Sequence, residues 1–308
     1  MKQLAMATAL LVSLVAVSRS VLGDGAGTVE WQQSAAVTRA HASAEESAGA
    51  DEEMRREPIK IGESVEGRPL HAYRFGEGER HIVIEAGIHG GYEWVTIVLA
   101  EKLLDHFREH ESEIPSTVSI HILPTMNPDG LQRVTGGEPL NEVDMTKRNT
   151  NRGRFNANNV DLNRNFDYAW KPTSRWWDIE VDAGSEPLSE PETRALRDYV
   201  EGLDPTPEVV VSLHSAAGGI YYGGREGYRE ASIYYSEIYA EASGYPVPDQ
   251  GFTQYEITGS SSDYFASQGI PAITVELTSH EDPEFERNLA GIEALIAEIA
   301  DAHSPGHR

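Results

Sequence analysis

Short apolar runs alternate with longer segments of helical periodicity over most of the chain. Four apolar runs are typical of buried strands: 81–86, 118–123, 209–213 and 272–277. Four other segments are predicted as helices: 94–107, 189–203, 233–242 and 285–300. This alternation predicts a single α/β domain with a mixed, mostly parallel central sheet flanked by helices on both faces. Ligands in such folds bind beyond the carboxyl ends of the strands, so candidate site residues are sought there.

The second predicted helix has a specific start signal. Ser189 and Glu192 are spaced as a capping box, in which a serine and a glutamate satisfy free backbone N–H groups of the first turn. The pattern predicts that Ser189 caps this helix.

The two ends of the chain depart from the alternating pattern. Residues 1–23 combine Lys2 with an apolar stretch and small residues beyond it, which predicts a secretory signal peptide, with an uncleaved anchor as the alternative. Residues 24–56 predict a disordered polar linker, 57–303 the folded domain and 304–308 a tail. The protein is therefore expected to be secreted or periplasmic, with no stable membrane association after signal removal.

Composition narrows the classes of function. The chain has 50 acidic and 25 basic residues, which gives a formal net charge of −25. Binding to nucleic acid or to anionic lipid surfaces is therefore not expected. The chain has no cysteine. This excludes disulfides, thiolate metal sites and a cysteine nucleophile, and leaves any metal to His, Asp or Glu.

Four polar clusters follow or end the predicted strands. They are the Gly-rich segment from His89 to Glu93, His214 at the end of an apolar strand, Glu276 inside another, and the Arg- and Asn-rich loop 152–166. Two imidazoles and a carboxylate complete a catalytic zinc site that keeps a position for water. A carboxylate buried in a strand has a raised pKa and makes a usable base near neutral pH, and arginines in an acidic protein form an anion site.

Each cluster also has an ordinary structural explanation. A Gly-rich turn can carry an incidental histidine, and a strand-end histidine is often a satisfied core residue. Glu276 can face solvent, and an Asn-rich loop can satisfy its own backbone. Taken one at a time, the clusters do not decide between these alternatives.

The order of the motifs along the chain is more informative. Several motifs follow one another in the order that they have in a known family. They are residues 61–70, the segment from Pro124 to Gly130, the segment from Val160 to Phe166, the segment from Pro187 to Glu192, His214 with its neighbours, and Val275-Glu276-Leu277. Over about residues 61–277 the chain resembles the zinc metallocarboxypeptidases, the family of pancreatic carboxypeptidase A and the bacterial murein-peptide amidases. The resemblance implies the fold of that family and an enzyme that hydrolyses peptides.

The resemblance also implies roles at the reacting bond. His89, Glu93 and His214 would hold one zinc ion per chain. Glu276 would be the general base that takes a proton from water and passes it to the leaving amine, and Arg154 would stabilise the oxyanion.

Further residues are implied in substrate binding. Asn163 and Arg164 would bind the terminal carboxylate of a peptide, and Tyr255 matches the tyrosine that closes over the substrate. Ser262 lies near the part of the pocket that contacts the terminal side chain, where it provides neither an acid nor an apolar wall. The expected partner is a peptide with a free C-terminus, from the cell wall or elsewhere, and the protein is expected to be a monomer.

One departure keeps two other functions open. The family's first metal motif is usually His-x-x-Glu, whereas this chain has His89-Gly-Gly-Tyr-Glu93, one residue longer. A Gly-Gly turn could absorb the extra residue or misplace the ligand. The alternatives are a zinc-dependent deacylase or amidase of small N-acyl amino acids, and a non-catalytic binding module with a degraded metal site.

Overall fold

A seven-stranded mixed sheet forms the centre of the domain in the computed structural model, which describes residues 57–224, 229–249 and 254–301. The predicted signal peptide, linker and tail lie outside these residues. The strands follow the order β1-β2-β4-β3-β7-β9-β8. In that order they are Ile59–Glu63, Pro69–Phe75, Val118–Leu123, Arg80–Glu85, Val209–Ser215, Ala272–Leu277 and Gly219–Tyr222. The four central strands are parallel, and antiparallel strands add to both sides.

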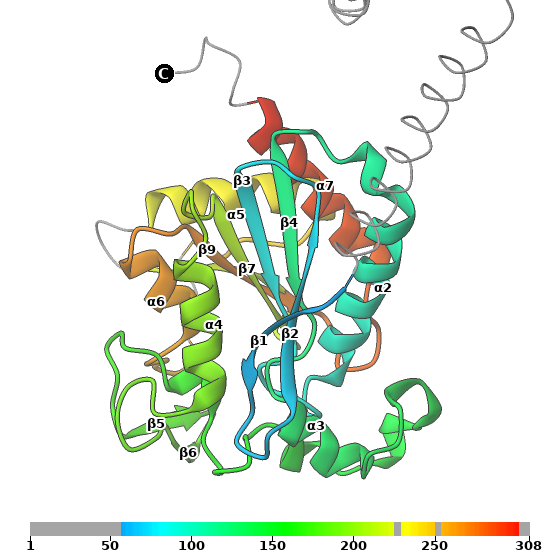
Figure 1. Cartoon of the computed structure of the whole chain (residues 1–308). Coiled ribbons are helices and arrows are strands. Elements are labelled where there is room, and N and C mark those ends of the chain that lie inside the picture. The colour runs from blue at the N-terminus through cyan, green and yellow to red at the C-terminus, as the bar shows by residue number, and fades with distance from the viewer. Residues whose placement is uncertain (1–56, 225–228, 250–253, 302–308) are drawn as a thin grey trace, which may run out of the picture. The chain divides into compact units, whose positions relative to one another are not determined.

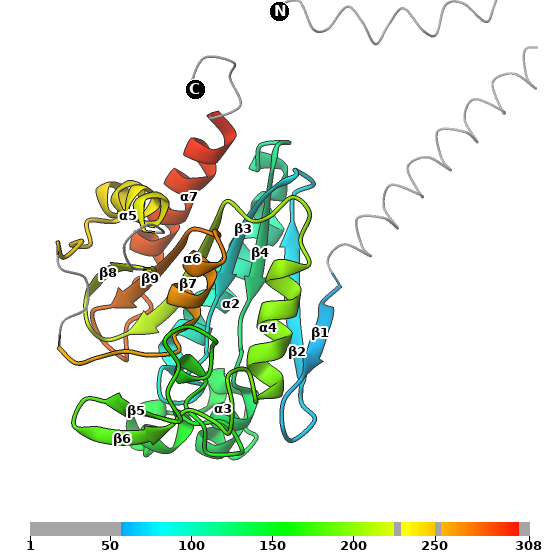
Figure 2. The same cartoon turned by 90° about the vertical axis from the view of Figure 1, so that its left-hand side faces the viewer.

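Helices cover both faces of this sheet (Figures 1 and 2). One face packs against α2 (Trp94–His110), α5 (Glu230–Ser243) and α7 (Phe285–Asp301), and the other against α4 (Pro191–Glu201) and α6 (Ser261–Ser267). The central strands are nearly all buried, as expected for a parallel sheet covered on both sides. The predicted fold class, four strands and four helices are therefore confirmed.

Smaller elements complete the domain. Helix α3 (Pro128–Thr135) begins after Asn127, whose side chain accepts a hydrogen bond from the Gly130 N–H, and it ends at Gly136 in the left-handed conformation. A separate hairpin of β5 (Thr173–Trp176) and β6 (Ile179–Asp182) lies outside the main sheet. Among the described residues, no helix is long and apolar enough to cross a membrane.

The predicted capping box is wrong. Helix α4 begins at Pro191 after Glu190, and the Ser189 hydroxyl donates to the Glu190 side chain instead of accepting from the helix. The side-chain carbonyl of Asn165 accepts from the Glu190 N–H at 3.2 Å and from the Thr193 hydroxyl at 2.7 Å. A residue distant in sequence thus holds the segment that leads into the helix, and the Glu190 side chain makes no capping hydrogen bond.

Candidate active site

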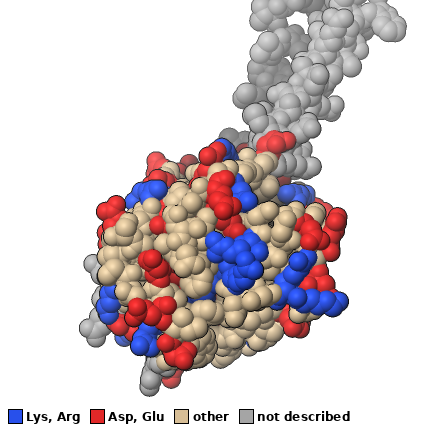
Figure 3. Space-filling view, turned by 90° about the horizontal axis from the view of Figure 1, so that it is seen from below, with Lys and Arg blue, Asp and Glu red and all other residues tan. Residues whose placement is uncertain are grey.

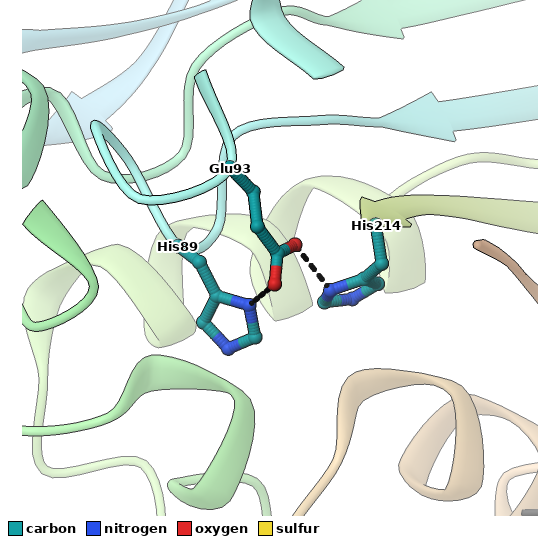
Figure 4. Close-up of side chains that lie close together, drawn as sticks. All are labelled: His89, Glu93 and His214. Atoms are coloured by element: carbon teal, nitrogen blue, oxygen red, sulfur yellow. Dashed lines mark hydrogen bonds and ion pairs between the residues drawn. The ribbon is translucent and has the colours of Figure 1, made fainter. Parts of the chain in front are cut away.

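Three candidate metal ligands converge where β3 and β7 end. His89 lies in the turn after β3, Glu93 immediately precedes α2, and His214 lies in β7. His89 Nδ1 is 2.8 Å from one Glu93 carboxylate oxygen, and His214 Nδ1 is 2.9 Å from the other (Figure 4). Ligand atoms from the three side chains all lie within 4.8 Å of one another, and all three residues are buried.

The extra residue of the metal motif is accommodated by glycines. Gly90 has φ +45°, a conformation that a residue with a side chain rarely adopts, and the turn closes with the Tyr92 N–H bonded to the His89 carbonyl at 3.0 Å. The turn is packed against backbone from two other segments. A Cβ on Gly90 would lie 2.7 Å from the Asn127 carbonyl oxygen, and one on Gly153 would lie 2.7 Å from the Gly91 Cα. This packing fixes the turn that brings Glu93 to both histidines.

Asp161 and Arg154 form a buried layer beside these ligands. The Asp161 carboxylate is 3.2 Å from His89 Nε2 and accepts from Arg154 Nε and Nη2 at 2.9 and 2.8 Å. Burial would raise the pKa of the Asp161 carboxyl, but Arg154 and Arg164 outweigh it and hold that pKa well below its ordinary value. Arg154 Nη1 is 3.4 Å from His89 Nδ1. One edge of the guanidinium is thus fixed by Asp161, while Nη1 is directed at the metal cluster.

Among the three candidate metal ligands, as at Asp161, the charges of neighbouring side chains outweigh the effect of burial on the pKa values. Burial would raise the pKa of Glu93, but His89 and His214 hold it well below the ordinary value of a glutamate. Burial would lower the pKa of His214, but Glu93 raises it instead. The cluster therefore favours an ionised Glu93, which is the form that binds a cation.

Glu276 lies next to this cluster on β9. It pairs in register with His214 on β7, and its carboxylate accepts from the Ala217 N–H at 3.1 Å. Burial, and after it the negative charge of Glu93, raise the pKa of Glu276 to about 7. A carboxyl with such a pKa can both accept and return a proton near neutral pH.

Asn163, Arg164 and Tyr255 line the same pocket as the metal cluster. The Ser261 N–H binds the Asn163 side-chain carbonyl at 2.9 Å, so the amide nitrogen points to His214 Nε2, 3.3 Å away. The Arg164 guanidinium is held by the carbonyls of Asn163 and Arg175 at 2.6 and 3.1 Å. It lies 5.9 Å from the Tyr255 ring centre. Two donors and a phenol therefore face the pocket beside the metal cluster.

One wall of the pocket carries hydroxyl groups. The Ser262 hydroxyl is 2.6 Å from that of Thr274, and both residues line the pocket. Ser262 is buried at the start of α6. This wall is polar and uncharged at these two positions.

All nine predicted site residues line one pocket of about 720 Å³. The sequence analysis did not assign roles to Asp161, Tyr92, Trp176 or His280, although Tyr92, Trp176 and His280 line the pocket and Asp161 binds two of its residues. Asp161 stands within the segment from Val160 to Phe166 and could have been found as the acid next to the arginines. Trp176 and His280 carry no comparable signal, because they reach the pocket only through the hairpin and the loop after β9.

The donor set fits zinc. Two imidazole nitrogens and one carboxylate are a ligand set of catalytic zinc sites, which leave a fourth position open. Asp161 at His89 Nε2 is the second carboxylate that orients a metal-binding histidine.

Comparisons with known proteins agree with this geometry. The zinc carboxypeptidase family matches residues 49–293. The chain is 26% identical over 251 residues to gamma-D-glutamyl-L-diamino acid endopeptidase 1 of Lysinibacillus sphaericus, which covers 72% of this chain and 61% of that protein. The chain thus spans less than two thirds of the length of this relative.

Solved structures agree as well. Carboxypeptidase A of Helicoverpa armigera matches with a TM-score of 0.63 at 23% identity, over 80% of this chain and 69% of that one. Murein-tripeptide amidase MpaA of Escherichia coli O157 matches with a TM-score of 0.55 at 25% identity, over 79% of this chain and 91% of that one. With most of its length matched by the family and a His–Glu–His site in place, the chain belongs to the zinc carboxypeptidases, a family of zinc-dependent peptide hydrolases.

Proposed function

We propose that this protein is an exported, zinc-dependent carboxypeptidase that removes the C-terminal residue of peptides. One observation carries the proposal: the His–Glu–His cluster, Glu276 and the Asn163–Arg164 pair line a single pocket. Export is proposed from the signal-peptide pattern of residues 1–23.

His89, Glu93 and His214 would hold the zinc ion. When bound there, zinc supplies Lewis acidity, which polarises a carbonyl group and lowers the pKa of water. Asp161 holds the His89 ring in place through Nε2, and Glu93 supplies the negative charge that attracts the cation.

Glu276 is the proposed general base. Its carboxylate would take a proton from the attacking water and return it to the nitrogen of the leaving residue, a transfer that its raised pKa makes easy in both directions. Arg154 is the proposed oxyanion donor, since its Nη1 is directed at the metal cluster while Asp161 holds the other nitrogens. A donor in such a position lowers the activation barrier by about 2.7–4 kcal/mol.

Arg164 and Asn163 would bind the free carboxylate of the substrate, with Tyr255 beside them. Arg164 and Asn163 line the same pocket as the metal cluster. A carboxylate bound to them would therefore place the last peptide bond, and no other, at the reacting groups. Lys and Arg side chains gather near the middle of the molecular face that carries α3 and the β5–β6 hairpin, which favours approach of an anionic chain end despite the overall negative charge (Figure 3).

Cell-wall peptides are the proposed natural source of the substrate. The Escherichia coli O157 amidase is named for a murein tripeptide, and the Lysinibacillus sphaericus endopeptidase is named for a gamma-D-glutamyl-L-diamino acid. The hydroxyls of Ser262 and Thr274 suit a polar terminal side chain.

The decisive experiment compares peptides that differ only at the C-terminus. The purified zinc-loaded protein is incubated with peptides whose C-termini are free or amidated, together with a murein tripeptide and an N-acyl amino acid, and products are identified by mass spectrometry. We expect loss of the last residue from free-ended peptides alone, abolished by a chelator. Cleavage of the N-acyl amino acid alone would instead indicate a deacylase, and no cleavage at all would indicate a binding module.

Two variants connect this activity to Glu276. Glu276→Gln should lower kcat by about 10²–10⁴-fold while zinc remains bound, because the amide cannot accept the proton. Glu180→Gln is the matched control, since Glu180 is exposed on β6 and should leave kcat unchanged. Retained activity in Glu276→Gln would remove this residue from the mechanism.

A further inference from the structure

A buried carboxyl group at the end of β3 has no role in the proposed reaction. Glu85 is the last residue of this strand and is not part of the pocket lining. The hydroxyls of Ser212 on β7 and Ser261 on α6 both donate to its Oε1, the second of them at 2.6 Å. Its Oε2 has no hydrogen-bond partner among the described residues. Because a buried polar atom without a partner costs free energy, a purpose other than stability is expected for this side chain.

The two bonds to Glu85 need an acceptor oxygen and not a negative charge. Burial raises the pKa of Glu85, and the hydrogen bonds from Ser212 and Ser261 offset only part of this rise. The carbonyl oxygen of a neutral carboxyl group accepts hydrogen bonds as the carboxylate does. The side-chain carbonyl of a glutamine could therefore accept the same two bonds.

Ser261 connects Glu85 to the pocket. It is the first residue of α6, where backbone N–H groups have no partner within the helix. Its hydroxyl donates to Glu85, while its N–H donates to the side-chain carbonyl of Asn163 at 2.9 Å. The amide nitrogen of Asn163 is then 3.3 Å from His214 Nε2. Since the two ends of an asparagine side chain have nearly the same shape, the bond from Ser261 decides that the donor faces the metal cluster.

Backbone contacts join the start of α6 to the loop that carries Asn163. Gly259 has φ +67°, and a Cβ at this position would lie 2.2 Å from the Arg164 carbonyl oxygen. The Gly259 carbonyl accepts from the Phe166 N–H at 3.0 Å. The start of α6 is therefore fixed against this loop at Gly259, and the Ser261 side chain fixes it to the sheet as well.

We infer that Glu85 is a positioning residue for substrate binding, which acts through Ser261 to hold the donor end of Asn163 towards the terminal carboxylate of the peptide. The inference rests on the proposed role of Asn163 and adds to it a residue outside the pocket. The terminal carboxylate takes no part in the bonds that form and break. Its binding contributes equally to the bound substrate and to the transition state, so a loss should appear in KM and not in kcat.

Ser261→Ala tests the link, because the variant keeps the N–H that binds Asn163 and loses the hydroxyl that holds it in place. With a free-ended peptide, we expect KM to rise about three- to tenfold, the contribution of one net hydrogen bond, while kcat stays within about twofold. Ser212→Ala is the matched control, since Ser212 binds the same Glu85 oxygen but has no hydrogen bond to Asn163 in the part of the chain that the structure describes. Its KM should stay within about twofold of the wild-type value.

The outcomes separate this inference from the proposed function. An unchanged KM in Ser261→Ala, or an equal rise in Ser212→Ala, would overturn the inference and leave the carboxypeptidase intact. If the wild-type protein cleaves no free-ended peptide, the proposed function fails and the inference fails with it. Zinc content and the thermal unfolding midpoint are measured for each variant, so that a general loss of structure is recognised.

Substitutions of Glu85 then separate hydrogen bonding from charge. Glu85→Gln retains an acceptor oxygen and should keep KM within about twofold of the wild-type value. Glu85→Met has no comparable acceptor and should raise KM as Ser261→Ala does. The double variant should have the KM of either single variant, because both substitutions break the same link. An equal rise in Glu85→Gln and Glu85→Met, or effects that multiply in the double variant, would overturn the inference. If Glu85→Met does not fold, Glu85→Gln and Ser261→Ala still decide the question.

Discussion

Strand β3 has a buried histidine cluster at each end, and the two clusters differ in their partners. Beyond its carboxyl end, His89 and His214 face the carboxylates of Glu93 and Asp161. At its beginning, His81 lies 2.7 Å from the Ser119 hydroxyl and 3.1 Å from His121 on β4, and His121 Nδ1 is 2.7 Å from the Tyr199 hydroxyl.

The partners decide the charge of each cluster. Burial would lower the pKa of His214, but Glu93 reverses the effect and raises it. Around His121 the partners are hydroxyls and another imidazole, so burial lowers its pKa to about 3 and His81 adds to the effect. The first cluster can balance a cation, whereas the second stays neutral and serves packing and hydrogen bonding. In this protein, the carboxylate of Glu93 between two buried histidines distinguishes the candidate metal site from the histidine pair at the other end of the strand.

The largest expected effect comes from removing that carboxylate. Glu93→Gln should lose zinc and reduce kcat/KM by about 10³-fold, since metal Lewis acidity contributes several kcal/mol. His121→Gln, at the other end of the strand, should retain zinc and activity. Metal analysis and peptide assays on both proteins check this contrast, and zinc loss in His121→Gln would erase the distinction between the clusters.

The second largest expected effect is on the free energy of unfolding at acid pH, to which the His121 cluster should contribute. Because the pKa of His121 is about 3 in the folded protein and 6.5 when unfolded, the unfolded state binds more protons between these values. Stability from the neutral histidine is complete above pH 6.5 and is lost as pH falls towards 3, by about 2–3 kcal/mol between pH 7 and pH 4.5. Urea unfolding across this range should show a smaller loss in His121→Gln. Equal losses in both proteins would contradict the assignment of a neutral, buried His121.

The smallest expected effect on the free energy of unfolding comes from the loss of a single hydrogen bond. Tyr199→Phe removes the hydroxyl that contacts His121 and should lower the free energy of unfolding by about 1 kcal/mol. Activity should not change, because Tyr199 lies on α4 and does not line the pocket. Thermal unfolding at neutral pH and the peptide assay measure the two quantities, and a fall in kcat/KM would link the clusters in a way that the structure does not suggest.

Prediction from sequence succeeded where apolar runs were long. The central strands and the helices α2 and α7 bury continuous or periodic apolar faces, and such patterns depend on local sequence alone. The edge strands β1 and β8, the neighbouring strand β2 and the β5–β6 hairpin went unpredicted, because strands that are short or only partly buried carry little apolar signal. The predicted α4 cap failed for a different reason, since the Ser189 hydroxyl donates to the Glu190 side chain while Asn165, from a distant loop, binds the Glu190 N–H.

In the candidate site, too, some features could be predicted from the sequence and others depend on contacts between distant segments. The nine residues named from the sequence meet in one pocket, and their roles rest on the family to which the chain belongs. The link from Glu85 through Ser261 to Asn163 could not be predicted, because its residues meet only after three separate segments have folded. Whether Glu93 could reach the metal cluster likewise depended on backbone packing around Gly90, Gly91 and Gly153, which no local pattern encodes.

That packing limits how the metal motif could be engineered. The turn from Gly90 to Gly91 fits only against the bare backbone of Gly130 and Gly153, where a Cβ at Gly130 would stand 2.3 Å from the Gly153 carbonyl oxygen. A His-x-x-x-Glu segment moved alone into another enzyme of this fold would therefore not adopt the same turn. The recipient would also need glycines at the positions of Gly130 and Gly153, so the segment and two positions distant from it would have to be replaced together.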